Sequence, residues 1–153
     1  GTIDGAEWVG PYDDEKLGFY KVAKHYYYPG WWEPGPVIHF FVNKKEWDKL
    51  PKEYQEAFQA AAYEANVTMM AEYDHKNPAG LSKLLQAGVK LQAYPKDVLE
   101  AAYKAAQELY ADESGKNPAF KKIFTEYDKY RKTQNAWFSL AENRMDSFSQ
   151  SHK

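Results

Sequence analysis

Apolar residues follow two different periods along the chain, and the change between them falls near residue 44. Before this point, short runs of β-prone residues are bounded by Pro and Gly. These runs predict a brief strand over residues 2–6, a Tyr-rich strand over 23–28 and another strand over 37–42. After residue 44, apolar residues mostly recur every three or four positions, which predicts helix for most of the remaining chain.

An acidic triplet, Asp13 to Glu15, precedes an apolar stretch that ends at Ala23. Acidic side chains are favourable near the N-terminus of a helix, because they complement the partial positive charge of the helix dipole there. We therefore interpret the triplet as the start of a short helix rather than as a metal site.

The first long apolar stripe begins after Pro51, a residue that suits the first position of a helix. Its members are spaced by three or four residues: Tyr54, Phe58, Ala61, Ala65, Met69 and Tyr73. The stripe predicts one helix of about 25 residues. We expect Asn77-Pro78 to break or kink it, because Pro lacks a backbone donor and disfavours helical geometry in the residue before it. A short helix should then end at Gly88, and the alternating residues 89–93 predict a strand.

Two further helices complete the predicted pattern. One should run from Lys96 to Ser114-Gly115, and Asn117-Pro118 should cap the last helix. The apolar stripe of this last helix continues nearly to the end of the chain: Phe120, Phe124, Tyr127, Tyr130, Trp137, Met145 and Phe148. A small domain rarely covers so long a stripe with its own surface, so we expect a partner to meet it. A helical dimerisation or interaction module is therefore one alternative function.

The predicted elements divide the chain into three segments of one helix-rich α/β domain. Residues 1–43 hold strand segments with candidate cleft residues, residues 44–88 the long helix, and residues 89–153 a strand and two C-terminal helices. The opening Gly1-Thr2-Ile3-Asp4 reads as entry into the middle of an established strand. We therefore expect the chain to be a fragment and the domain to be incomplete.

Composition narrows the possible classes of function. Cysteine is absent, which excludes disulfides, thiol catalysis and thiolate metal sites. The formal net charge is −2 and no basic stripe is present, which argues against nucleic-acid binding. No apolar run approaches the length of a membrane span. Aromatic residues make up 17% of the chain, an excess over a minimal core that fits a ligand cleft or a helix interface.

Two glutamates flanked by Trp carry the candidate chemistry. Glu7-Trp8 and Trp31-Trp32-Glu33 each follow a short apolar run, near the predicted strand ends where open α/β sheets gather their ligands. A buried carboxylate is costly unless it is paired, hydrogen-bonded or bound to a cation. We therefore predict a ligand site at these residues.

The residues alone leave three interpretations of Glu7 and Glu33 open. They fit a general acid/base pair of a carbohydrate-active enzyme, with the neighbouring Trp rings as sugar platforms. They also fit hard oxygen ligands of Ca²⁺ or Na⁺, helped by a backbone carbonyl. The third interpretation is a pair of half-exposed loop acids. The scattered histidines and the lack of a Gly-rich phosphate loop or nucleophile elbow indicate no other catalytic site.

Two stretches, from Ile3 to Tyr12 and from Tyr26 to Glu33, carry a family resemblance. The chain resembles the C-terminal half of the extracytoplasmic solute receptors of tripartite ATP-independent periplasmic (TRAP) transporters, and is most similar to the branch that binds 2-oxo acids. The resemblance covers essentially the whole chain. It implies a periplasmic receptor without catalysis of its own, which delivers a small organic acid to the membrane subunits of a TRAP transporter.

The same resemblance implies a fold and roles for individual residues. The fold is part of a periplasmic-binding-protein-like clamshell with a long spine helix and a long C-terminal helix. A cation, Na⁺ or Ca²⁺, bridges the ligand carboxylate in that branch, and the matching groups here are the Glu7 carboxylate, the Trp8 backbone carbonyl and the Glu33 carboxylate. The cleft would be lined by Trp8, Trp31 and Trp32. Members can also dimerise through the long C-terminal helix, which assigns a homodimer interface to Trp137, Phe138, Met145 and Phe148.

One part of the family pattern has no match in this chain. Family receptors clamp the substrate carboxylate with an Arg, and add a Gln to the cation, from a segment that precedes the one resembled here. Arg131 and Arg144 do not match that Arg, because both lie in the predicted last helix. A guanidinium binds a carboxylate bidentately and so fixes its orientation. We therefore expect this chain by itself to bind solute weakly or not at all.

Overall fold

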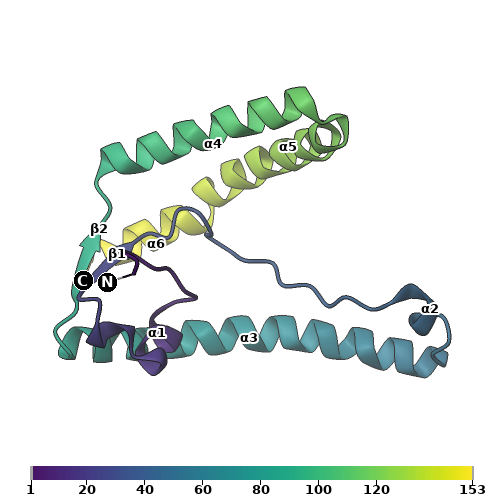
Figure 1. Cartoon of the computed structure of the whole chain (residues 1–153), viewed down its shortest axis with the longest axis horizontal. Helices are drawn as coiled ribbons and strands as arrows, with labels where there is room; N and C mark the ends of the chain where they lie inside the picture. The colour runs from purple at the N-terminus through teal and green to yellow at the C-terminus, as the bar shows by residue number, and fades with distance from the viewer. Residues whose placement is uncertain (1, 153) are drawn as a thin grey trace. The chain divides into compact units, whose positions relative to one another are not determined.

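The computed structural model describes residues 2–152, which form two compact units. Residues up to Tyr94 form the first unit and residues from Pro95 onward the second. The first unit contains α1 (Pro11–Leu17), the 3₁₀ helix η1 (Phe19–Lys21), β1 (His25–Tyr28), α2 (Lys44–Trp47), α3 (Lys52–Gln86) and β2 (Lys90–Ala93) (Figure 1). The second unit contains three helices: α4 (Lys96–Lys116), α5 (Pro118–Leu140) and α6 (Glu142–Gln150). Among the described residues, no helix is both long and apolar enough to cross a lipid bilayer.

The two strands pair in parallel, so their carboxyl ends lie at the same edge of the sheet. His25 is opposite Lys90 and Tyr28 is opposite Ala93. The pairing extends past the end of β2, because the Tyr94 N–H donates to the Tyr28 carbonyl oxygen at 2.8 Å. The strands predicted over 23–28 and 89–93 are thus confirmed in position, within two residues at their starts.

The first unit has its core where α1 crosses the C-terminal part of α3. Leu84 of α3 is only 2% exposed, and Val89 is also buried. The crossing is close at Gly80, where an added Cβ would lie 2.8 Å from the backbone of Pro11 and Tyr12. A glycine at this position therefore lets the two helix backbones approach each other, as small residues do at tight helix contacts.

The prediction was a break or a kink at Asn77-Pro78, and the break is wrong, because α3 runs without interruption from Lys52 to Gln86. Pro78 cannot donate to the carbonyl one turn earlier, a cost of about 3 kcal/mol in an isolated helix. Contacts with α1 offset this cost. The Asn77 side chain accepts a hydrogen bond from the Tyr12 N–H at 3.2 Å, and so satisfies a backbone donor in the first turn of α1 that has no partner within the helix.

The strands predicted over residues 2–6 and 37–42 are not formed. The second stretch is extended and exposed, and no other strand pairs with it in the part of the chain described by the structure. A β-prone sequence needs a neighbouring strand for its backbone hydrogen bonds. The sequence pattern therefore predicted an extended backbone, but it could not show whether another strand lies beside it.

The acidic triplet lies within a helix, but that helix differs from the predicted one. α1 begins at Pro11, so that Asp13 and Asp14 lie in its first turn, where their charge is favourable. The N-cap residue Gly10 has no capping side chain. α1 ends at Leu17, where Gly18 adopts the left-handed conformation (φ 75°) that ends many helices. The following residues to Ala23 are not α-helical.

The second unit is built on the contact between α4 and α5. Tyr110 of α4 and Phe124 of α5 pack with ring centroids 4.7 Å apart. The predicted cap is confirmed, because the Asn117 side chain accepts hydrogen bonds from two backbone N–H groups in the first turn of α5. Two details differ from the prediction: α4 continues past Ser114-Gly115 to Lys116, and the last helix is divided at Ala141 (φ −83°, ψ −97°) into α5 and α6.

Candidate functional site

The loop after β1 places a pair of Trp rings beside Glu7. Trp31 and Trp32 meet edge to face, with ring centroids 5.4 Å apart. The Trp32 indole N–H donates to the Glu7 Oε2 atom at 3.3 Å, which joins two sequence stretches that lie 25 residues apart. The structure therefore brings together the two stretches in which sequence analysis placed the ligand site.

An open hollow lies beside this contact. It has a volume of about 410 Å³ and is lined by Gly5, Ala6, Glu7, Trp32 and Tyr94. Tyr94 follows β2 and packs edge to face on Trp32, with ring centroids 6.1 Å apart. The hollow therefore lies at the carboxyl edge of the parallel strands, which is where α/β sheets place their ligands.

Sequence analysis missed Tyr94 as a residue of this site. The available signal was its position directly after a predicted strand, next to Pro95. That signal becomes useful only with the knowledge that the two strands are parallel neighbours, since only then do the residues after both strands meet.

Both candidate glutamates are exposed in this chain, as are Trp8, Trp31 and Trp32. Glu33 lies in a turn in which its own backbone N–H donates to the Gly30 carbonyl oxygen at 3.3 Å. Neither carboxylate therefore carries the desolvation cost of a buried charge, and their charges need no partner within the chain.

The donor set is chemically suited to a hard cation. A carboxylate oxygen has two lone-pair positions, so the single hydrogen bond from Trp32 leaves most of the acceptor capacity of Glu7 available. Within residues 2–152, no group of three or more His, Asp or Glu side chains is arranged to hold a metal ion. Two carboxylates and one backbone carbonyl provide oxygen ligands of the kind that Ca²⁺ takes, but fewer than the usual six to eight.

α1 also carries a buried acid, Asp14, that sequence analysis did not single out as functional. Asp14 is only 5% exposed, and its Oδ2 atom accepts a hydrogen bond from the Tyr26 hydroxyl of β1 at 2.5 Å. Its Oδ1 atom is buried and has no hydrogen-bond partner among the described residues. Burial raises the pKa of Asp14, and the negative charges of Asp13 and Glu7 add to the rise, although the Tyr26 hydrogen bond opposes it.

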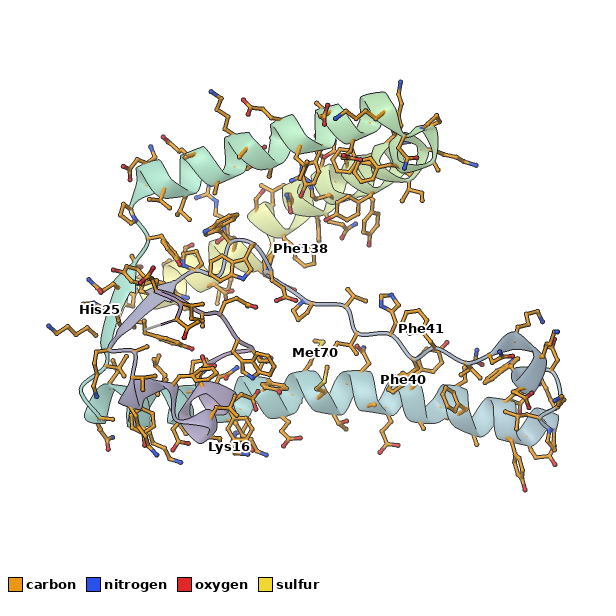
Figure 2. The ribbon with its side chains drawn as sticks, viewed as in Figure 1. Lys16, His25, Phe40, Phe41, Met70 and Phe138 are labelled. Atoms are coloured by element: carbon orange, nitrogen blue, oxygen red, sulfur yellow. The ribbon has the colours of Figure 1, made fainter. Side chains whose placement is uncertain are left out.

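The other side of α1 is joined to α3 by polar contacts. The Tyr73 hydroxyl donates to the Asp13 Oδ2 atom at 2.7 Å, a bond that raises the pKa of Tyr73. The Tyr12 hydroxyl accepts hydrogen bonds from Lys16 and Lys76, which lower the pKa of Tyr12 (Lys16 is labelled in Figure 2). Two acids of α1 thus join it to its neighbours: Asp14 bonds to Tyr26 of β1, and Asp13 bonds to Tyr73 of α3.

The residues assigned to a dimer interface all belong to the second unit. Trp137 and Phe138 lie near the end of α5, whereas Met145 and Phe148 lie in α6. All four side chains are exposed in this chain. Large exposed apolar side chains on neighbouring helices are typical of a surface that meets a partner.

Comparison with known proteins gives one family and several close relatives. The family described as bacterial extracellular solute-binding protein, family 7 (DctP), matches residues 1–116. A monocarboxylate 2-oxoacid-binding periplasmic protein of Nostoc sp. is 46% identical over 151 residues, which are 99% of this chain and 42% of that protein.

Two solved structures are also similar. The first is a TRAP transporter solute-binding protein from Bordetella bronchiseptica, which is 48% identical with a TM-score of 0.96, over 99% of this chain and 45% of that one. That structure is a mixed-occupancy dimer, with copurified calcium and picolinate in one active site and an apo site. A TRAP periplasmic solute-binding protein from Colwellia psychrerythraea, with bound calcium and pyruvate, is 34% identical with a TM-score of 0.90, over 95% of this chain and 45% of that one. This chain therefore spans less than half the length of these relatives.

Proposed function

Because this chain belongs to the bacterial extracellular solute-binding protein family 7, we propose that it forms the cation-binding part of a periplasmic receptor for a small organic acid of the 2-oxo acid class. The receptor would deliver this acid unchanged to the membrane subunits of a TRAP transporter. The observation that carries the proposal is the contact of Glu7 with Trp32 at a hollow on the carboxyl edge of the parallel strands.

The cation would be held by the Glu7 carboxylate, the Trp8 backbone carbonyl and the Glu33 carboxylate. These are hard oxygen donors, which suit Ca²⁺ or Na⁺. The remaining coordination positions would be filled by the ligand carboxylate, by water and by the part of the receptor beyond this chain. Calcium bound together with picolinate or pyruvate in the two similar structures supports this arrangement.

The aromatic residues would form walls around the acid. Trp32 and Tyr94 pack edge to face and line the hollow beside Glu7, and Trp31 packs on Trp32. Flat apolar walls with a few polar groups are the usual composition of a small-molecule site. A 2-oxo acid is small and planar at its carboxylate end, which fits a slot between rings beside a cation.

The complete receptor would hold the acid more tightly than this chain can. A cation neutralises the ligand carboxylate, but a guanidinium that pairs with it bidentately also fixes its orientation. Neither Arg131 nor Arg144 belongs to the unit that contains the hollow. We therefore propose that the carboxylate clamp comes from the rest of the receptor, and that closure around the bound acid stabilises the ligand-bound state.

The proposal is tested in a chimera of the Bordetella relative, in which this chain replaces the 45% of the relative that it matches. Pyruvate is titrated into the chimera in the presence of Ca²⁺ by calorimetry. We expect Glu33→Gln to weaken pyruvate binding at least on the order of 10-fold, because even the loss of an outer partner of a metal ligand weakens metal binding by about that factor or more.

The matched control is Glu46→Gln, an identical change at an exposed glutamate of α2 whose side chain forms a surface ion pair with Lys49. This control should leave pyruvate affinity unchanged, because an exposed pair of this kind contributes little. Pyruvate binding that is equally tight in Glu33→Gln and in the control would refute the role of Glu33.

A further inference from the structure

The hydrogen bond between Asp14 and Tyr26 joins the two elements from which the candidate site extends. Asp14 belongs to α1, which begins four residues after Glu7 (Figure 1). Tyr26 belongs to β1, which ends three residues before Trp31. Among the described residues, no other hydrogen bond joins α1 to β1. The position of one stretch of the site relative to the other therefore depends on how these two elements are held.

The two stretches have little direct contact of their own. The Trp32 indole N–H donates to Glu7 at 3.3 Å, and both side chains are exposed. In the part of the chain that the structure describes, no second hydrogen bond joins residues 2–10 to the loop 29–36. A functional site needs its groups held to within about 0.5 Å, and rigid supporting elements usually provide this precision. The support for Glu7 and Glu33 must therefore come from the elements behind them.

Asp14 is costly to bury in the way that this fold buries it. One of its oxygens accepts from the Tyr26 hydroxyl, whereas the other is buried without a hydrogen-bond partner among the described residues. Burial is the largest cause of the raised pKa of Asp14, and the negative charge of Glu7 contributes, so this acid lies within electrostatic reach of the site. An unsatisfied buried polar atom in a native protein needs an explanation, because it lowers stability. A role in the site would provide one.

We propose that Asp14 and Tyr26 are positioning residues of the cation site. Their hydrogen bond sets α1 against β1, and so holds the Glu7-Trp8 stretch beside the loop that carries Glu33. Neither Asp14 nor Tyr26 lines the hollow, so both act through the ligands and not on the cation itself. This inference rests on the proposed function, because it concerns the same site.

α1 offers a matched bond on its other side. The Tyr73 hydroxyl donates to Asp13 at 2.7 Å, so each bond joins a tyrosine hydroxyl to an acid in the first turn of α1. Tyr73 belongs to α3, from which neither stretch of the site extends. Loss of either hydroxyl should lower the melting temperature, whereas only loss of the Tyr26 hydroxyl should disturb the site. Tyr73→Phe is therefore the control for Tyr26→Phe.

The first measurement needs no cation. Fluorotryptophan is incorporated into the chimera described above, and the Trp32 signal is identified in the fluorine NMR spectrum by its loss in Trp32→Phe. Without Ca²⁺, Tyr26→Phe should shift or broaden this signal, because neither oxygen of Asp14 then has a partner and the acid moves towards water with α1. Tyr73→Phe should leave the signal in place. A Trp32 signal that is unchanged in Tyr26→Phe, or that changes equally in both variants, would overturn the proposal.

The second measurement is Ca²⁺ affinity, by calorimetry of the chimera in the presence of pyruvate. Tyr26→Phe should weaken Ca²⁺ binding on the order of 10-fold, which is within the range that supporting residues away from a ligand reach. Tyr73→Phe should bind Ca²⁺ as tightly as the unsubstituted chimera. Asp14→Asn keeps an acceptor for the Tyr26 hydroxyl, so it should bind Ca²⁺ more tightly than Asp14→Ala.

Glu33→Gln separates failure of this inference from failure of the proposed function. Weaker Ca²⁺ binding in Glu33→Gln, together with equal Ca²⁺ binding in Tyr26→Phe and Tyr73→Phe, would contradict the positioning role alone. Ca²⁺ binding that Glu33→Gln leaves intact would refute the cation site and, with it, this role of the Asp14–Tyr26 bond.

Discussion

At the scale of single residues, Asp14 shows how a fold can place an acid where its charge is unfavourable. The acid is buried between α1 and β1, one of its oxygens accepts from Tyr26, and the other has no partner among the described residues. An unpaired buried polar atom costs free energy, and more so when it carries charge. The proton therefore stays on the folded Asp14 at a higher pH than on an ordinary Asp, which is what the raised pKa expresses.

The free energy of unfolding should consequently fall as the pH rises from the ordinary Asp pKa through the raised pKa of Asp14. Because the folded state binds the Asp14 proton more tightly than the unfolded state, the free energy of unfolding gains a contribution that is fully present below the ordinary Asp pKa of 3.8. This contribution is lost as the pH rises through the raised pKa. We expect Asp14→Asn to flatten this part of the profile, measured by urea unfolding across acidic to neutral pH.

The control for this prediction is Asp74→Asn, which removes the same charge from an exposed position of α3. Its profile should keep the slope of the unsubstituted chain. Identical slopes in Asp14→Asn and in the unsubstituted chain would show that Asp14 titrates as an ordinary exposed acid.

The roles of some residues could be predicted from the sequence and those of others could not, for a physical reason. Asn117 was predicted as a helix cap because capping depends on neighbours two and three residues away. The burial of Asp14 and the role of Tyr94 depend instead on which elements pack together. Asp14 is buried where α1 meets Tyr26 of β1, and Tyr94 reaches Trp32 only because β2 pairs with β1.

At the scale of elements, the contact between α1 and α3 positions the site. α1 begins four residues after Glu7 and ends before the strand that leads to the Trp loop. Its approach to α3 depends on Gly80, where there is no room for a side chain. The contact also explains why α3 passes through Pro78 when a prediction from local sequence expected a break.

We predict that Gly80→Ala separates α1 from α3. The new Cβ would lie 2.8 Å from backbone atoms of Pro11 and Tyr12, so the helices must move apart. Overpacking of this kind costs about 1 to 3 kcal/mol. Thermal unfolding followed by circular dichroism should show the loss as a lower melting temperature.

Gly115→Ala is the matched control, because it makes the same change within α4 at a glycine with open space around it. It should be neutral or stabilising by up to about 1 kcal/mol, since Ala favours helix over Gly. A Gly80→Ala chain as stable as the control would show that the close crossing is not needed.

The strands show where local pattern stops being informative. The alternating run 89–93 and the Tyr-rich run before Pro29 both form strands, because each supplies the partner of the other. Segment 37–42 has a stronger apolar pattern but no partner in the described chain, and it remains unpaired. Local sequence specifies the preference for extended backbone, whereas pairing depends on the rest of the molecule.

At the scale of the whole molecule, the helix-rich fold and the family resemblance are both confirmed. Residue runs near Glu7 and Trp31 carried the resemblance to the C-terminal half of TRAP solute receptors. This resemblance agrees with the family match and with both similar structures. The roles of individual residues in ligand, cation and dimer contacts stay predictions.

A homodimer through α5 and α6 is the prediction at this scale. We expect Trp137→Glu or Phe148→Glu to convert a dimer to a monomer, because a charge would be buried without a partner in an apolar interface. Molecular mass by light scattering measures the change.

Tyr103→Glu provides a matched control for the dimer, since Tyr103 of α4 and Trp137 are each 61% exposed in this chain. The control should keep the mass of the unsubstituted protein. A mass that neither Trp137→Glu nor Phe148→Glu changes would remove these residues from any interface.

The most direct test of the proposed site is the coupling between the cation and the acid. Pyruvate affinity of the chimera is measured with saturating Ca²⁺ and with a chelator, in the unsubstituted protein and in Glu7→Gln. If the cation bridges Glu7 and the ligand carboxylate, Ca²⁺ should tighten pyruvate binding on the order of 5- to 150-fold in the unsubstituted protein, and the factor should fall towards one in Glu7→Gln. Pyruvate binding of equal strength with Ca²⁺ and with the chelator in the unsubstituted protein would contradict the proposed mechanism.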